Sequence, residues 1–285
     1  MDLRTVIGLE PIDSQFRWRL AVTPRTITGG NFLFGGIGLA AAIEALESAS
    51  GRPCVWAAAQ FLSYAARGSV VHIDVTLANH GHNTTQARAI AKVDDREIFT
   101  VNAALGVRNY PHEGQYAERP DVPLPHECPK REFRQDMYPS VQDLTEQKIA
   151  NGRTISQLDG TTGTGRHAMW VRFVDGIDMS GAALGFLGDW VPSGIHQALG
   201  IHAGGNSLDN TIRIVRVVPT EWVLLDIRLH AIANGFAHGL VHIWADDGTL
   251  MATASQSTIV REWKDFPVVR GIKSTVENTD SEESK

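Results

Sequence analysis

The sequence predicts an α+β protein made of two repeats, each an antiparallel sheet wrapped around a long central helix. Three observations lead to this fold class. A strand, an enclosed apolar helix and four further strands follow one another in the first half of the chain. The same order of elements begins again in the second half. The helical segments of both halves are apolar on nearly every side, which is typical of helices enclosed by other structure.

The first half begins with a strand at 16–22, where large apolar residues alternate with polar ones. After the break Gly29-Gly30-Asn31, the segment 32–47 is helical, and charge appears only near its end. Alternation then predicts a meander of four antiparallel strands, the last two joined by a turn at Asp94-Asp95-Arg96. These strands are expected at 55–64, 70–78, 84–93 and 97–107.

The middle of the chain, 109–165, is predicted to be a linker that lies over the surface. Prolines recur from Pro111 to Pro139 between charged residues, and a Gly/Thr-rich run follows at 160–165. That run lacks the Lys-Ser/Thr ending of a phosphate loop, so we interpret it as flexible chain. A weak helical pattern at 141–149 interrupts the linker.

The second half repeats the first. Met169, Val171 and Phe173 match residues 153 positions earlier, and the alternating run 223–229 matches 71–77 at an offset of 152. A shared order of elements and phase of alternation indicates an internal duplication. We therefore expect an N-terminal repeat at 1–108, the linker at 109–165, a C-terminal repeat at 166–273 and a disordered polar tail at 274–285.

Composition narrows the classes of function. A net charge of −6, spread through the chain, gives no basic surface for nucleic acid or an anionic membrane. The apolar runs are too short to span a bilayer and the N-terminus lacks the pattern of a signal peptide, so we expect a cytoplasmic protein. Two cysteines, Cys54 and Cys128, make no disulfide framework. His80 and His82 lie in a turn between strands, and we expect no metal site there.

Several short motifs resemble the double hot-dog acyl-CoA thioesterases, the acyl-CoA thioesterase II family. The motifs, in chain order, are FGG at 34–36, LGFLGD at 184–189, SLD at 207–209, PTEW at 219–222 and ATASQ at 252–256. Each motif alone is weak, and the match rests on their order and spacing. The resemblance implies two hot-dog repeats in one chain and hydrolysis of an acyl-CoA thioester, with coenzyme A as part of the substrate and no metal or redox cofactor.

The resemblance also implies a catalytic set. In the family, an Asp, a Thr or Ser and a Gln together hold the attacking water, and these positions fall on Asp189, Ser207 and Gln256. Each residue type suits its role, because the carboxylate takes a proton, the hydroxyl accepts and donates, and the amide orients without changing charge. Ser207 stands where such enzymes often carry Thr.

The same resemblance suggests residues around the substrate. Backbone N–H groups near Gly35 and Gly36 are expected to polarise the thioester carbonyl, with glycine permitting close approach. Trp190 is expected to line an acyl tunnel, and Asp209 to support Asp189 as a polar neighbour.

The duplication makes the two repeats unequal. Under the same offsets Asp189, Ser207 and Gln256 correspond to Gly36, Cys54 and Ala104, so only the second repeat carries the polar set. We expect one active site per chain, and exposed sheet edges predict a dimer or larger homo-oligomer.

Other interpretations stay open at this point. Asp189 precedes Trp190-Val191-Pro192 and is compatible with capping a short helix. An acyl-CoA hydratase or dehydratase of the same fold is an alternative, although the fifth residue after Asp189 is Gly194 where those enzymes carry His. A non-catalytic acyl-binding protein with a decayed site is a third possibility.

Overall fold

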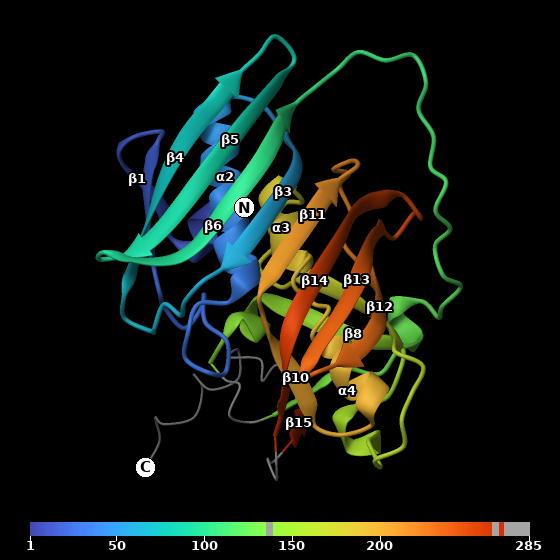
Figure 1. Ribbon diagram of the computed structural model, residues 1–285. Coiled ribbons are helices and arrows are strands. Elements are labelled where there is room, and N and C mark those ends of the chain that lie inside the picture. The colour runs from blue at the N-terminus through green and yellow to red at the C-terminus, as the bar shows by residue number, and fades with distance from the viewer. Residues whose placement is uncertain (135–138, 264–267, 271–285) are drawn as a thin grey trace, which may run out of the picture.

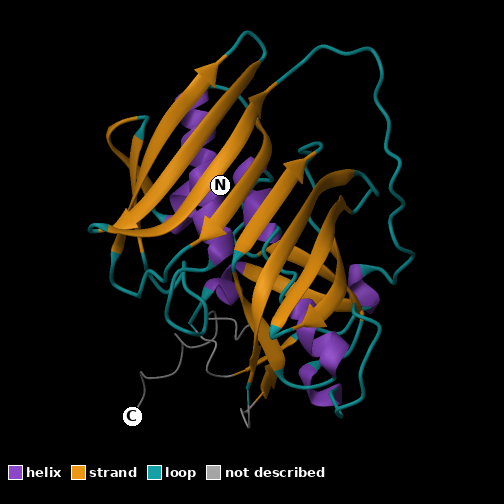
Figure 2. Ribbon diagram, viewed as in Figure 1, coloured by secondary structure: helices purple, strands orange, loops and turns teal. Residues whose placement is uncertain are grey.

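A computed structural model describes residues 1–134, 139–263 and 268–270 (Figure 1). Its main feature is one long antiparallel sheet of 13 strands within these residues. Neighbouring strands follow the order β1-β2-β4-β5-β6-β3-β11-β14-β13-β12-β9-β8, and β10 also pairs with β14. Figure 2 shows the strands in front of the main helices, which therefore lie on one face of the sheet.

The N-terminal half of the sheet wraps around helix α2. Its strands are β1 (Leu9–Ser14), β2 (Arg17–Ala21), β3 (Cys54–Phe61), β4 (Val70–His80), β5 (Thr84–Val93) and β6 (Arg96–Gly106). Helix α2 (Gly35–Ser50) is buried over most of its length and ends at Gly51, whose φ of 66° suits glycine. The strands alternate between buried and exposed residues, as half-buried strands do. The sequence-predicted strands agree with β2 to β6 to within a few residues.

Two short elements at the N-terminus were not expected. Helix α1 (Leu3–Ile7) is capped by the Asp2 side chain, which accepts a hydrogen bond from the Thr5 N–H. Strand β1 shows no alternation, because only Leu9 of its six residues is buried. A strand with one buried side chain leaves no periodic pattern in the sequence.

The segment 109–165 begins as an extended chain along one side of the molecule (Figure 1). Its residues pack on the outer face of the sheet, where the Trp170 indole N–H donates to the Pro123 carbonyl at 2.8 Å. The segment then forms regular structure that the linker prediction did not include. These elements are β7 (Glu132–Arg134), β8 (Thr145–Asn151) and three 3₁₀ helices at Pro125–Glu127, Val141–Leu144 and Ile155–Gln157.

The weak helical pattern at 141–149 was therefore wrong beyond its first turn. Strand β8 pairs with β9 and alternates between buried and partly buried residues from Thr145 to Ile149. The buried members include Gln147, whose amide donates to Gln142 and Thr145 at 2.8 Å. A polar residue on the inner face hides the period-2 pattern by which strands are predicted.

The C-terminal half of the sheet carries the second set of elements. Its strands are β9 (Arg166–Phe173), β10 (Ala203–Ser207), β11 (Asp209–Ile214), β12 (Val223–Ala233), β13 (Phe236–Ala245) and β14 (Leu250–Glu262), while β15 (Val268–Arg270) pairs with β7. Strands β3 and β11 join the two halves of the sheet.

The helical segment of the second half is broken into α3 (Gly181–Leu187) and α4 (Ser193–Leu199). Helix α3 ends at Gly188, and Pro192 precedes α4, so that 188–192 form a turn. Helix α3 packs antiparallel to α2 through small residues. A Cβ on Gly185 would lie 2.8 Å from Ile43 and 3.5 Å from the Ala40 backbone. The turn places Asp189 at the N-terminus of α2.

Among the described residues, no helix has the length and apolar character needed to cross a membrane. The polar tail expected at 274–285 lies outside the described residues.

Candidate active site

The side chains of Asp189, Ser207 and Gln256 meet at the turn between α3 and α4. The Ser207 hydroxyl donates to Asp189 Oδ1 at 3.1 Å, and Gln256 Nε2 donates to the same oxygen and to Ser207 Oγ, the latter at 2.9 Å. Gln256 Oε1 accepts the Val191 N–H at 3.1 Å, which fixes the orientation of the amide. Three residues from three elements thus form one hydrogen-bonded group.

A β-bulge positions the hydroxyl. Ser207 lies opposite Thr258, and Thr211 lies opposite Ser255, so three residues of one strand face two of its partner. A bulge of this kind re-aims side chains that strict alternation would place on opposite faces. The Asp209 carboxylate accepts the Ser257 N–H at 2.7 Å across the bulge. Asp209 therefore holds the bulge, while none of its side-chain hydrogen bonds in the described part of the chain reaches Asp189.

Gly35 and Gly36 lie at the N-terminus of α2, against Asp189. A Cβ on Gly35 would lie 2.7 Å from Asp189 Oδ2, and one on Gly36 would lie 2.7 Å from the Phe186 carbonyl oxygen and 3.0 Å from the Asp189 Cβ. Glycine is needed here because Asp189 and its helix approach the backbone so closely. A thioester was expected to approach Gly35 and Gly36 closely, but in the structure the group that lies against them is the Asp189 carboxylate.

Burial raises the pKa of Asp189 to about 6, although hydrogen bonds from Gln256, Ser207 and the Gly36 N–H lower it. The side chain is only 4% exposed. Loss of hydration disfavours the charged form, while the helix N-terminus and the three donors favour it. A carboxylate with a pKa near neutrality is suited to take a proton from water and return it.

Trp190 lies beside Asp189 in an aromatic group. Its ring centroid is 5.8 Å from that of Phe34 and 6.1 Å from that of Phe186. The Arg131 guanidinium lies 5.6 Å from the indole centroid. The indole N–H is buried and has no hydrogen-bond partner in the described residues. Trp190 thus forms an apolar wall next to the carboxylate.

The structure also bears on two other roles, helix capping by Asp189 and nucleophilic attack by Cys54. Helix α4 has Pro192 as its N-cap and no side-chain cap hydrogen bond, so Asp189 does not cap it. Cys54 is buried, and burial together with nearby Glu47 raises the pKa of its thiol to about 12. A thiol in this state is a poor nucleophile.

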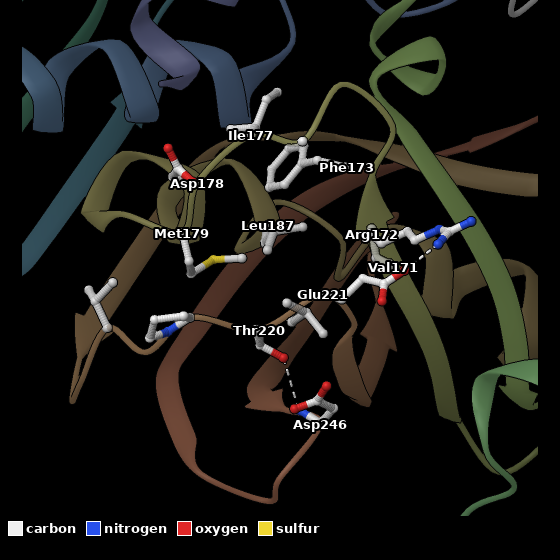
Figure 3. Close-up of a pocket in the computed structure, with 14 residues that line it drawn as sticks. Val171, Arg172, Phe173, Ile177, Asp178, Met179, Leu187, Thr220, Glu221 and Asp246 are labelled. Carbon is white, nitrogen blue, oxygen red and sulfur yellow. Dashed lines mark hydrogen bonds and ion pairs between the residues drawn. The ribbon is translucent and has the colours of Figure 1, made fainter. Parts of the chain in front are cut away.

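A cavity of about 800 Å³ lies elsewhere, at the end of β9 (Figure 3). Val171, Phe173 and Leu187 contribute apolar surface, and Arg172 and Glu221 form an ion pair at its edge. None of the residues expected at the active site lines this cavity. Because its carboxylates, Asp178, Glu221 and Asp246, are all exposed, we place the chemistry at the buried Asp189 and not in this cavity.

The sequence prediction missed one polar residue near the site, Asn210. Its side chain is fully buried, and neither amide atom has a hydrogen-bond partner in the described residues. Asn210 is in phase with buried Ile212 in β11, and a polar residue at an inward position leaves no apolar pattern in the sequence.

Comparison with known proteins agrees with this fold. The family model for the acyl-CoA thioesterase C-terminal domain matches residues 125–260. A "putative thioesterase" from Novosphingobium aromaticivorans is 32% identical, with a TM-score of 0.80 over 88% of this chain and 97% of that one. No curated protein matches the sequence.

Two further structures share the fold at lower identity. A protein of unknown function with a hot-dog fold from Alicyclobacillus acidocaldarius is 18% identical, with a TM-score of 0.78 over 90% of this chain and 97% of that one. An acyl-CoA thioesterase II from Mycobacterium marinum is 20% identical, with a TM-score of 0.71 over 92% of this chain and 98% of that one.

Taken together, the hot-dog sheet and the matched domain define a thioester hydrolase. The chain belongs to the thioesterase family of its Novosphingobium relative, and its residues 125–260 match the acyl-CoA thioesterase C-terminal domain.

Proposed function

We propose that this protein hydrolyses an acyl-CoA to the free acid and coenzyme A, using a water molecule held by Asp189, Ser207 and Gln256. The observation that carries the proposal is the shared hydrogen bonding of these three side chains around one carboxylate oxygen. A buried base with oriented donors is what general-base hydrolysis requires. The proposal rests on family membership for the reaction and on this geometry for the residues.

The reaction proceeds in two steps. The water oxygen bonds to the thioester carbonyl carbon while Asp189 takes one proton, and the carbonyl π electrons move onto oxygen. The tetrahedral intermediate then collapses, the C–S bond breaks, and the departing thiolate takes the proton back from Asp189. The products are a carboxylic acid and coenzyme A as its thiol, so protons and electrons balance without a redox group.

The two-repeat arrangement is part of the proposal. Strands β2-β4-β5-β6-β3 and β9-β12-β13-β14-β11 lie in equivalent orders in the sheet, which supports repeats at 1–108 and 166–273. The second repeat would carry the catalytic group. The first would contribute the N-terminus of α2, whose Gly36 N–H lowers the pKa of Asp189. We expect one active site per chain.

We also expect an oligomer. Strand β1 ends the sheet on one side, whereas residues 129–131 pair with the outer side of β8. The edge of an outer strand such as β1 is a surface on which chains associate. Light scattering coupled to size-exclusion chromatography would give the mass, and a monomer at micromolar concentration would contradict this expectation.

Thiol release tests the function directly. Wild-type protein is assayed over short, medium, long and aromatic acyl-CoAs, together with Ser207→Thr and Ser207→Ala. We expect Ser207→Thr to retain activity, because it keeps the hydroxyl, and Ser207→Ala to lose about 10²-fold in kcat. Absence of thiol release from every acyl-CoA would refute the enzymatic proposal.

The hydratase alternative is distinguished by its product. Gly194, the fifth residue after Asp189, lies in α4 and has no side chain to act as a second base. Water added across an enoyl double bond, with the thioester intact, would favour that alternative over hydrolysis.

A further inference from the structure

Asn210 is an exception to the rule that buried polar groups are hydrogen-bonded. The residue is 0% exposed, and both Nδ2 and Oδ1 have no hydrogen-bond partner among the described residues. Leaving a buried amide unsatisfied is unfavourable, whereas a leucine of similar size at the same position would avoid the penalty. The position therefore needs an explanation other than stability.

The β-bulge places this amide beside the catalytic group. Asn210 lies opposite Ala59 on one side, and on the other side the three bulge residues, 208–210, face Gln256 and Ser257. Directly paired side chains of neighbouring strands lie about 5 Å apart. Because the bulge changes the phase of alternation, Ser207 and Asn210 both face the interior.

The Asn210 amide is as deeply buried as the group it adjoins. Asp189 is 4% exposed and Gln256 3%. A thioester that reaches a water bound by Asp189 must enter this interior, so its carbonyl oxygen arrives within reach of the neighbouring strand position. An amide N–H without an acceptor is then a donor aimed into the site.

The donors that contact the Asp189 carboxylate are already used. Gln256 Nε2 donates to Asp189 and Ser207, and the Gly36 N–H acts on the Asp189 carboxylate. These groups hold the base and its water. They leave the carbonyl oxygen, on which negative charge develops, without an assigned donor.

We propose that Asn210 is a further catalytic residue, whose Nδ2–H donates to the thioester carbonyl oxygen as it becomes an oxyanion. This inference rests on the proposed hydrolysis at Asp189. It assigns to a side chain the role that the sequence suggested for the backbone of Gly35 and Gly36.

The first test is Asn210→Leu, which removes both polar atoms at similar size. We expect kcat for thiol release to fall by about 10²- to 10³-fold, with KM within a few-fold of wild type and the thermal midpoint equal or higher. If the variant keeps kcat within twofold of wild type, or loses activity only together with its fold, the proposal is wrong. Should Asn210→Leu be insoluble, Asn210→Ala provides the same comparison.

Thr258→Val is the matched control. Thr258 is also fully buried with an unpartnered hydroxyl, and it pairs with Ser207 in the same sheet. Thr258→Val removes the hydroxyl and should keep kcat within about twofold of wild type. An equal loss of kcat in both variants would show that packing near the bulge, not a donor at Asn210, limits the rate.

A spectroscopic measurement separates a donor from a structural residue. Acyl-CoA labelled with ¹³C at the carbonyl is bound to Asp189→Asn, which slows turnover, and its stretching band is recorded by infrared difference spectroscopy. The carbonyl stretching band should lie at a lower frequency in Asp189→Asn than in the double variant Asp189→Asn/Asn210→Leu. Identical bands would overturn the proposal. If wild type hydrolyses acyl-CoA and Asp189→Asn does not, the proposed function stands whatever Asn210 does.

Discussion

Replacing Asp189 by Asn should make the protein more stable at neutral pH while removing its activity. The carboxyl has an ordinary pKa of 3.8, and burial raises it to about 6 in the folded protein. Because the pKa is raised, the folded state holds the proton more tightly than the unfolded state. The cost of ionising Asp189 is absent below pH 3.8, grows between pH 3.8 and 6, and is complete above pH 6.

The size of this effect follows from the two pKa values. Their difference corresponds to about 3 kcal/mol at pH 8, and to roughly half of that at pH 5, where the folded state is still mostly protonated. Asparagine keeps an oxygen that can accept from Ser207 and Gln256 and carries no charge. Asp189→Asn should therefore be more stable than wild type, by a margin that grows from pH 5 to pH 8.

Urea unfolding at pH 5 and pH 8 measures this margin in wild type and Asp189→Asn. Asp95→Asn, at an exposed turn residue, makes the same chemical change in solvent and controls for the loss of an acid as such. A variant that is less stable than wild type at both pH values would show that Asp189 is a structural cap of α2, and would refute the reasoning from burial.

Three other substitutions test the frame around the site. Gly36→Ala should cost at least about 2 kcal/mol in urea unfolding and lower kcat, because its Cβ would lie 2.7 Å from the Phe186 carbonyl oxygen; unchanged stability would contradict this close approach. Asp209→Ala should cost about 1–3 kcal/mol and reduce kcat by releasing the Ser257 N–H at the bulge, and full activity would show that the bulge needs no such support. Burial lowers the pKa of His167 to about 4, so protonation of this group alone should destabilise wild type by about 3 kcal/mol relative to His167→Gln as pH falls from 6.5 to 4. His167→Gln should remove that loss, and an unchanged acid transition would assign it elsewhere.

The parts of the fold that the sequence predicted share a simple physical origin. Strands β4, β5 and β6 alternate over much of their length because one face packs on α2, and α2 is apolar on nearly every side because the sheet and α3 enclose it. These patterns are local and periodic. The catalytic candidates Asp189, Ser207 and Gln256 came from resemblance, and the structure brings them into contact.

The parts that were missed depend on tertiary contacts. Strand β8 has Gln147 on its buried face, and the Gln147 amide donates to Gln142 and Thr145. Such side-chain hydrogen bonds leave no periodic pattern in the sequence, unlike a run of alternating apolar residues. The second helical segment breaks at Gly188, although its composition resembles that of α2. Asn210 was overlooked because a polar residue on the inward face of β11, in phase with Ile212, adds nothing to the apolar period by which strands are predicted.

The pH dependence of thiol release in wild type and Asp189→Asn tests the central claim most directly. If Asp189 is the base, wild-type kcat falls tenfold per pH unit below a pKa near 6, and the variant is slower by at least about 10³-fold with no such limb. A variant that keeps the wild-type rate and the same acid limb would contradict it.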